Sequence, residues 1–301
     1  PWVLMARDHG LVVRWMDFNT ETFEFDDDAL DKVLSDKTRL VCVGGASNLT
    51  GTINDVKAIS RLCRDAGAWS YIDAVQLAPH VAIDVQELGC DFLVCSAYKF
   101  FGPHHGILWG RRELLEQLEP YKVRPAPQQI PGCFETGTLN HEGCAGVAAA
   151  VNYLADLGDT MAGDYLHNWS HFEGRRQTVH AAMEYLFDYE KTIAERLVSR
   201  LVDIDGITVQ GITAPDAMDR RVPTVAFTHC SVASADIARA LGARNIFVWS
   251  GHNYAVEVAK TLGIYDTGGA VRVGPVHYNS EEEIDAFADA LQAIISDESK
   301  H

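Results

Sequence analysis

Short apolar runs alternate with amphipathic stretches through the first half of the chain. Runs rich in Val, Leu, Ile and aromatic residues predict buried strands, and they cover residues 11–13, 39–43, 69–73, 91–95 and 106–110. Between two of these runs, Val56, Ile59 and Cys63 recur at helical spacing, and Gly67 ends that helix. This rhythm predicts parallel strands joined by right-handed crossovers, and therefore an α/β fold.

Charged residues predict two further helices in this half. Asp26, Asp27 and Asp28 form an acidic run of the kind that favours a helix N-terminus. Arg111 follows the run at 106–110 and begins a short helix.

The pattern changes after residue 118. Several prolines make residues 119–140 a long irregular loop, and loops of that length are uncommon unless they are functional. An amphipathic helix is predicted over residues 175–203. Ser280 and Glu283 have the spacing of a capping box and start a last helix. The other elements expected here are strands at 207–209, 224–227, 246–248 and 271–273 and a helix that begins at Ser234.

These changes predict two domains. We expect a large domain over residues 1–175, a connecting helix over 176–203 and a small α+β domain over 204–301.

Composition narrows the class of protein. A net charge of −17 disfavours binding to nucleic acid or to an anionic membrane. No apolar run reaches transmembrane length, and no signal peptide is visible. The seven cysteines show no CxxC spacing, which is typical of reduced thiols in a cytoplasmic protein. His80, His104 and His105 lack the spacing of metal ligands, so no metal is expected.

A lysine and an aspartate follow neighbouring predicted strands. Asp73 ends the run at 69–73, and Lys99 follows the run at 91–95. Ligands bind at the carboxyl ends of strands in open α/β sheets. A lysine can form a Schiff base with the aldehyde of pyridoxal 5′-phosphate, and a carboxylate can hold the pyridinium proton that makes the ring an electron sink. Taken singly, the two residues also fit a surface lysine and a helix cap.

Five motifs in a fixed order extend this pattern. They are Ala46-Ser47-Asn48-Leu49-Thr50-Gly51-Thr52, Asp73-Ala74-Val75-Gln76, Ser96-Ala97-Tyr98-Lys99 with Gly102-Pro103, Phe134-Glu135-Thr136-Gly137-Thr138, and Val271-Arg272-Val273. Together they resemble the class V aminotransferase family of fold-type I pyridoxal phosphate enzymes, which includes the cysteine desulfurases. The resemblance covers nearly the whole chain. It implies a large cofactor-binding domain, with a mainly parallel sheet between helices, and a smaller C-terminal α+β domain.

The resemblance also implies roles around the cofactor ring. Lys99 would form the Schiff base and act as the acid and base at the substrate's α-carbon, which requires a lowered pKa. Asp73 would pair with the pyridine nitrogen, Val75 would pack on one face of the ring, and Gln76 would donate to the phenolic oxygen.

Other residues would hold the phosphate and the substrate. Ser96 and Tyr98 would give hydroxyl groups to the phosphate, although desulfurases usually have His at the position of Tyr98. Gly137 and Thr138 resemble the pair that reaches the neighbouring subunit's phosphate, which implies a homodimer with shared active sites.

The substrate itself would be a small amino acid. Asn48 would lie near the phenolic oxygen and the substrate carboxylate, and Arg272 would clamp that carboxylate through its planar fork.

Two departures from the family pattern concern the substrate side. Desulfurases carry their sulfur-accepting cysteine on a loop that matches residues 249–255, and here Tyr254 stands at about that position. A phenol cannot replace a thiolate in this chemistry, so we predict a cysteine desulfurase-like protein without persulfide formation. Trp249 stands where some relatives have a substrate-binding arginine, which predicts a bulkier, less polar pocket and a substrate that is not a dicarboxylic amino acid.

The start of the chain is a further departure. The family has a segment of roughly a hundred residues before the equivalent of Pro1, with part of the phosphate site and a group that stacks on the ring. Without it, cofactor affinity would fall.

The prediction is therefore a pyridoxal phosphate enzyme, either an aminotransferase or a lyase, acting on a small amino acid. The sequence does not separate transamination from β-elimination. A non-catalytic protein of the same fold, acting as a partner or regulatory subunit, is the alternative. The chain has neither a Gly-x-Ser-x-Gly elbow nor a Gly-x-Gly-x-x-Gly turn, which disfavours a hydrolase or a dehydrogenase.

Overall fold

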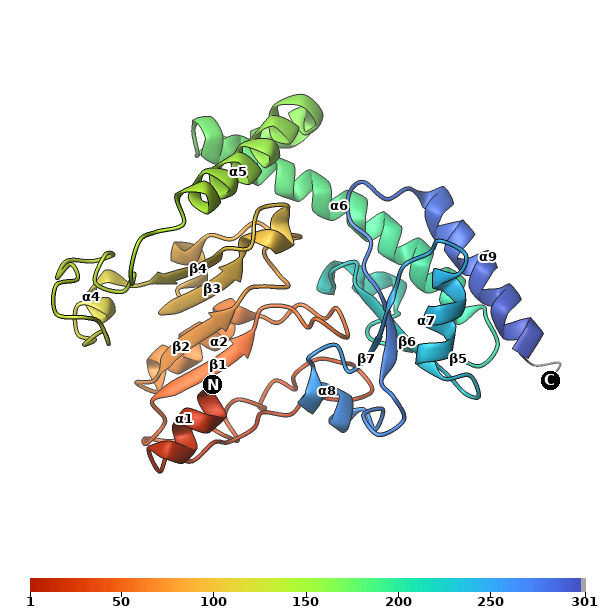
Figure 1. Cartoon of the computed structure of the whole chain (residues 1–301), viewed down its shortest axis with the longest axis horizontal. Helices are drawn as coiled ribbons and strands as arrows, with labels where there is room; N and C mark the ends of the chain where they lie inside the picture. The colour runs from red at the N-terminus through yellow and green to blue at the C-terminus, as the bar shows by residue number, and fades with distance from the viewer. Residues whose placement is uncertain (299–301) are drawn as a thin grey trace.

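The computed structural model describes residues 1–298, and its first half is built on a four-stranded sheet (Figure 1). The strands lie in the order β1-β2-β3-β4. β1, β2 and β3 pair in parallel, whereas β4 pairs antiparallel to β3. Their bounds are β1 Leu40–Gly44, β2 Trp69–Asp73, β3 Phe92–Ser96 and β4 Gly106–Gly110.

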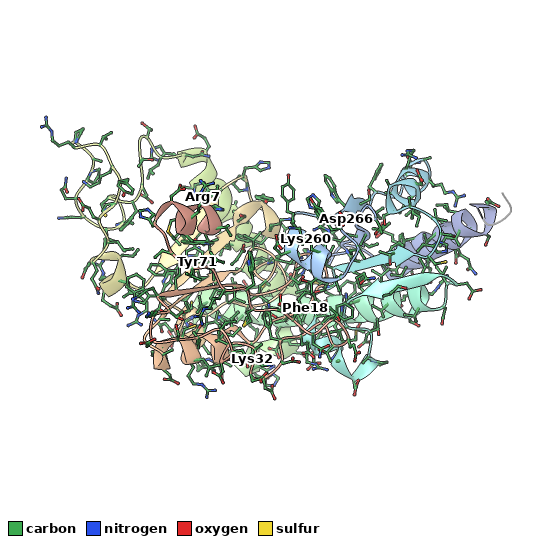
Figure 2. All side chains as sticks on the ribbon, turned by 90° about the horizontal axis from the view of Figure 1, so that it is seen from below. Arg7, Phe18, Lys32, Tyr71, Lys260 and Asp266 are labelled. Atoms are coloured by element: carbon green, nitrogen blue, oxygen red, sulfur yellow. The ribbon has the colours of Figure 1, made fainter. Side chains whose placement is uncertain are left out.

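Short helices surround this sheet. Asp55 begins α2 (Val56–Asp65) by accepting the Ala58 N–H at 2.9 Å, and the helix buries Val56, Ile59 and Cys63 against the strands. α1 (Trp2–Asp8), which carries Arg7 in Figure 2, lies at β2, where the ring centroids of Trp2 and Tyr71 are 4.9 Å apart. The remaining short helices are α3 (Val85–Leu88), the 3-10 helix η1 (Ala97–Phe100) and α4 (Arg112–Leu115).

Two long helices pack together and lead to the second half (Figure 1). α5 (His141–Met161) contacts α6 (Gly174–Val202), and the 3-10 helix η2 (Gly163–Trp169) connects them. α6 buries its apolar residues along its whole length, including Met183, Ile193 and Leu201. Its C-terminal part belongs to the core of the second sheet, so one helix supports both halves.

The second sheet is antiparallel and lies in the order β5-β6-β8-β7. Its strands are β5 Ile207–Gln210, β6 Val225–His229, β7 Trp249–Gly251 and β8 Ala270–Val273. The helices beside it are η3 (Pro215–Arg220), α7 (Ser234–Gly242), α8 (Val256–Thr261) and α9 (Glu281–Glu298). α9 begins with the predicted capping box, because the Ser280 N–H donates to Glu283 Oε2 at 3.0 Å and the Glu283 N–H donates to Ser280 Oγ at 3.3 Å.

The two halves are joined next to the carboxyl ends of β1 and β2. The Val222 N–H donates to the Gly51 carbonyl at 2.9 Å, and Thr52 forms a β-bridge with Arg221. The Arg221 side chain is only 1% exposed and donates to the carbonyl groups of Ile212 and Thr224. Burial lowers the pKa of this guanidinium to about 10, which leaves it charged at neutral pH.

Four local predictions were wrong. Residues 11–13 form no strand and residues 26–28 form only turns. The strand expected at 246–248 begins at Trp249 instead. β4 runs antiparallel because the link from β3 contains only η1 and a turn, too short for a parallel crossover.

The other expected elements are present within a few residues of their predicted bounds. The division into domains at residues 175 and 203 stays a prediction. Among residues 1–298, no helix combines the length and apolar character that crossing a membrane requires.

Candidate active site

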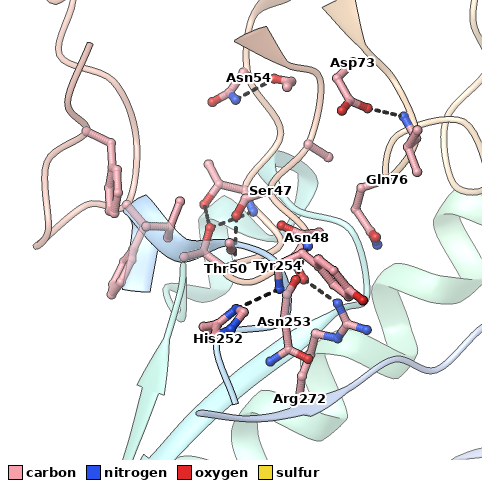
Figure 3. Close-up of a pocket in the computed structure, with 18 of the residues that line it drawn as sticks. Ser47, Asn48, Thr50, Asn54, Asp73, Gln76, His252, Asn253, Tyr254 and Arg272 are labelled. Carbon is pink, nitrogen blue, oxygen red and sulfur yellow. Dashed lines mark hydrogen bonds between the residues drawn. The ribbon is translucent and has the colours of Figure 1, made fainter. Parts of the chain in front are cut away.

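A cavity of about 890 Å³ lies where the two sheets meet (Figure 3). The first sheet contributes residues at and after the carboxyl ends of β1, β2 and β3. The second sheet contributes β7, the loop that follows it and Arg272 of β8. The predicted site residues that line this cavity are Asn48, Asp73, Val75, Gln76, Tyr98, Lys99 and Arg272.

Lys99 reaches the cavity from η1, directly after β3. Phe101 ends η1 in the left-handed region (φ 70°), and the Gly102 N–H donates back to the Ala97 carbonyl at 2.9 Å. Burial lowers the pKa of the Lys99 ammonium below its ordinary value, and the positive charge of Arg272 lowers it further. The neutral amine, which is the nucleophilic form, is therefore more populated than in an exposed lysine.

Asp73 ends β2 with its carboxylate at the cavity. Its Oδ1 atom accepts the Val75 N–H at 2.9 Å (Figure 3), which fixes the carboxylate in the turn after the strand. Its Oδ2 atom has no hydrogen-bond partner within residues 1–298. This oxygen can accept a hydrogen bond from a protonated nitrogen of a ligand.

Gln76 connects the two halves of the site. Its Nε2 atom donates to Thr224 Oγ1 at 2.9 Å. Gln76 lies in the first turn after β2, and Thr224 is the residue before β6. This contact uses one amide hydrogen and leaves the second for a ligand.

Arg272 projects from β8 beside the loop that contains Asn48. One guanidinium nitrogen donates to the Asn48 carbonyl at 3.0 Å, and Asn48 Nδ2 donates to the Asn253 carbonyl at 2.7 Å. Burial lowers the pKa of Arg272, but a guanidinium stays protonated at neutral pH. The Arg272 side chain donates to a backbone carbonyl and has no carboxylate partner within the described residues, so its charge is available to an anion.

Of the four residues predicted to hold the phosphate, only Tyr98 lines the cavity. Ser96 ends β3 but does not line the cavity, and Tyr98 is half-exposed with its ring centroid 5.3 Å from that of His104. Gly137 and Thr138 are exposed in the long loop and do not line the cavity either. The structure therefore gathers the predicted ring and substrate residues but not all of the predicted phosphate residues.

The loop after β7 presents Tyr254 at the cavity. Tyr254 is 96% exposed and has a left-handed backbone (φ 62°), and its N–H donates to His252 Nδ1 at 3.2 Å (Figure 3). All seven cysteines lie in the described part of the chain, and none of them lines the cavity. Burial raises the pKa of the Cys63 and Cys90 thiols to about 11, so both are protonated at neutral pH.

Three phenylalanines that line the cavity were not predicted. Phe18, Phe23 and Phe25 line the cavity from a tight turn in which the Phe23 N–H donates to the Asn19 carbonyl at 2.7 Å. Phe23 has a left-handed backbone (φ 62°), which is unfavourable for a bulky residue. No sequence pattern marks these residues, because the turn reaches the cavity only through tertiary packing.

The gathered groups fit pyridoxal phosphate. They provide an amine of lowered pKa, a carboxylate with one uncommitted oxygen, an amide donor and an unpaired guanidinium in one cavity. Within residues 1–298, no cluster of His, Cys, Asp and Glu has the arrangement of a metal site.

Comparison with known proteins places the chain in a family. A model described as aminotransferase class-V matches residues 1–172 and 178–287. A probable cysteine desulfurase from Halalkalibacterium halodurans is 30% identical over 305 residues, which cover 97% of this chain and 66% of that protein. The aminotransferase-like protein FGM3 from Gibberella zeae is 32% identical over 302 residues, which cover 98% of this chain and 69% of that protein.

Solved structures of cysteine desulfurases have the same fold as this chain. The apo cysteine desulfurase from Thermococcus onnurineus NA1 superposes with a TM-score of 0.83 at 25% identity, covering 98% of this chain and 69% of that one. The cysteine desulfurase CsdA from Escherichia coli gives a TM-score of 0.81 at 24% identity, covering 98% and 68%.

Fold and site thus define an α/β protein of fold-type I, as the sequence predicts. The chain belongs to the aminotransferase class-V family, whose members depend on pyridoxal phosphate. It spans about 66% of the length of the curated desulfurases that it matches.

Proposed function

We propose that this protein is a pyridoxal phosphate-dependent enzyme that acts on a small amino acid through Lys99, without forming a persulfide. The observation that carries the proposal is the meeting of Lys99, Asp73 and Arg272 in one cavity. Bound pyridoxal phosphate supplies an electron-withdrawing ring that stabilises negative charge at the substrate's α-carbon.

Lys99 has two tasks in this proposal. Its Nζ atom would bind the cofactor aldehyde, and as a free amine it would then take the proton from the substrate's α-carbon. Both tasks need the neutral amine, which burial and Arg272 favour. Asp73 Oδ2 would hold the proton of the ring nitrogen, while Oδ1 stays engaged with the Val75 N–H.

Arg272 orients the substrate. Its guanidinium would bind the α-carboxylate, and its contact with the Asn48 carbonyl fixes the direction of the fork. Because Arg272 lies on the second sheet and Lys99 follows a strand of the first, a substrate bound to Arg272 would point its α-hydrogen towards Lys99.

Persulfide formation needs a thiolate next to the substrate's sulfur. Tyr254 occupies the loop after β7, and the cavity lining contains no cysteine among the described residues. We therefore propose transamination or β-elimination as the reaction class.

A homodimer is part of the proposal. Gly137 and Thr138 are exposed and lie outside their own chain's cavity. This placement suits residues that reach the phosphate of a neighbouring subunit. Gly137 has the left-handed backbone (φ 73°) of a tight turn.

The test is covalent labelling of Lys99. Purified protein is incubated with pyridoxal phosphate, reduced with borohydride and digested, and the modified peptide is mapped by mass spectrometry beside Lys99→Ala and Lys57→Ala. Lys57 pairs with Glu87 on the surface and serves as the matched control. We expect the label on Lys99 in the wild type and in Lys57→Ala, and its loss in Lys99→Ala.

Cysteine and other amino acids are then added to the loaded protein. We expect a keto acid or ammonia from at least one amino acid, and no sulfur bound to the protein after cysteine. Absence of the Lys99 label from the wild type would contradict the proposal and favour a non-catalytic partner protein.

A further inference from the structure

Trp249 stands directly opposite Arg272 in the second sheet. The two residues are register partners in the antiparallel pair of β7 and β8. Side chains of such partners lie on the same face of a sheet, with their Cβ atoms about 4.5–5.5 Å apart. Both residues line the cavity, and Trp249 is 70% exposed, so its indole is not part of the core.

Trp249 therefore lies next to any carboxylate that Arg272 binds. A substrate held there has its side chain within reach of the indole. The exposed indole also leaves apolar surface that a ligand can cover.

Charges in the cavity restrict that side chain further. Among the described residues that line it, the only lysine and arginine are Lys99 and Arg272, and the only carboxylate is Asp73. The proposed function commits each of the three, to the cofactor aldehyde, to the α-carboxylate and to the ring nitrogen. No lysine or arginine remains for a second carboxylate, and no carboxylate remains for an ammonium group. His252 also lines the cavity, but its Nδ1 atom accepts the Tyr254 N–H.

Aromatic surface is abundant in the same cavity. Tyr254 lines it from the loop after β7, and Phe18, Phe23 and Phe25 line it as well. The backbone of Tyr254 is held by its hydrogen bond to His252 and by the contact between Asn48 and the Asn253 carbonyl.

We infer that Trp249 is a specificity residue that selects amino acids with one carboxylate and an apolar side chain. This inference rests on the proposed function and deepens it. Burying one apolar side chain against a protein surface changes affinity by about 10- to 100-fold, so the preference is measurable in binding alone.

The test compares three carboxylates that lack an amino group and cannot react. Propionate carries the carboxylate alone, 3-phenylpropionate adds an aromatic group, and succinate adds a second carboxylate. Each is titrated by calorimetry into protein loaded with pyridoxal phosphate. We expect 3-phenylpropionate to bind about 10- to 100-fold more tightly than propionate, and succinate to bind no more tightly than propionate.

Variants then assign the preference to Trp249. We expect Trp249→Ala to reduce the ratio of 3-phenylpropionate to propionate affinity several-fold, and Trp249→Phe to keep most of it. Phe247→Ala is the matched control, because Phe247 is 84% exposed in the same segment but does not line the cavity. Its ratio should equal that of the wild type.

Two results would overturn the inference. One is tighter binding of succinate than of 3-phenylpropionate, and the other is a ratio that Trp249→Ala leaves unchanged. Each protein is also labelled at Lys99, which shows separately that the site is folded and loaded. If wild-type Lys99 is not labelled, the proposed function is refuted. If Lys99 is labelled but Trp249→Ala leaves the affinity ratio unchanged, only the role of Trp249 is refuted.

Discussion

At the scale of single residues, the environment of Lys99 is governed by two effects of the same sign. Burial removes water from the ammonium, and Arg272 adds a like charge, so both lower the lysine pKa. Burial is the larger of the two effects. Arg272 therefore helps to keep the Lys99 amine neutral, and its own charge stays available to a carboxylate.

Removing the charge of Arg272 should raise the pKa of Lys99. In Arg272→Gln the protonated amine loses its repulsive neighbour, so binding of the cofactor aldehyde should need a higher pH than in the wild type. The midpoint should stay below that of a free lysine, because burial persists. Initial rates of absorbance change after mixing with pyridoxal phosphate, measured across pH, give this midpoint.

Arg272→Lys is the control for this prediction. It keeps a positive charge beside Lys99, and its midpoint should lie near that of the wild type. A midpoint in Arg272→Gln that stays in place or moves to lower pH would show that the charge of Arg272 does not act on Lys99.

Lys99, Asp73 and Arg272 were predicted from apolar runs that they end, follow or lie within, and all three line one cavity, while their roles stay predictions. The sequence was a poor guide to what surrounds them. The closeness of Trp249 to Arg272 depends on the register of β7 and β8, which no local pattern encodes. Phe23 reaches the cavity through a turn with an unfavourable backbone conformation, which a sequence pattern does not predict for a phenylalanine.

At the scale of elements, the turn from Ala46 to Ile53 joins the two sheets. Ala46 and Ile53 form a β-bridge, and the Ser47 N–H donates to the Thr52 carbonyl at 2.8 Å. Gly51 lies at its far end with a left-handed backbone (φ 78°), pressed against the second sheet. A Cβ atom added there would lie 2.4 Å from the Thr224 carbonyl oxygen.

Gly51→Ala should therefore destabilise the protein more than an ordinary glycine replacement. Gly67→Ala is the matched control, because Gly67 has a similar φ of 71° but open space around the added carbon. We expect Gly67→Ala to cost about 1–2 kcal/mol from backbone strain. Gly51→Ala should cost about 1–3 kcal/mol more, because the added carbon also clashes. Free energies of unfolding in urea check this, and equal values for the two variants would contradict it.

Elements with a strong internal pattern were predicted well, and those that depend on partners were not. The long helix α6 agrees with its pattern because it buries a clear apolar set, and the strand at 69–73 has paired neighbours on both sides. Residues 11–13 have strand-forming side chains, but the sheet offers them no neighbour, and a strand without hydrogen-bonding partners does not form. Residues 26–34 make isolated turns, because a short helix does not repay the cost of nucleation.

At the scale of the whole molecule, a group of titratable side chains lies where α5, α6 and the loops after β2 and β8 meet. His80 Nδ1 and Glu190 Oε2 are 2.7 Å apart in the interior. Nearby, His277 Nε2 is 2.6 Å from the Tyr153 hydroxyl, and burial holds the pKa of His277 below its ordinary value. The negative charge of Glu190 partly opposes this shift, and His80 adds to it.

The lowered pKa of His277 predicts lower stability in mild acid. The unfolded chain binds a proton at His277 near pH 6.5, whereas the folded protein binds it only at lower pH. Between these values the unfolded state carries more protons, so the free energy of unfolding decreases as pH falls below about 6.5. His277→Gln should reduce this dependence, because glutamine does not titrate.

Thermal unfolding from pH 8 to pH 5 measures the effect. His167→Gln is the control, since His167 is exposed and should leave the pH dependence of the wild type unchanged. Identical slopes for the wild type and His277→Gln would show that His277 does not contribute.

The division of the site between two sheets has a consequence for how such a protein can evolve. The residues proposed to drive the reaction, Lys99 and Asp73, follow strands of the first sheet, whereas Trp249 lies on a three-residue edge strand of the second. Trp249 is largely exposed, so its replacement removes little from either core. A lineage can therefore acquire a new substrate by mutating an edge strand while its reaction centre is inherited intact.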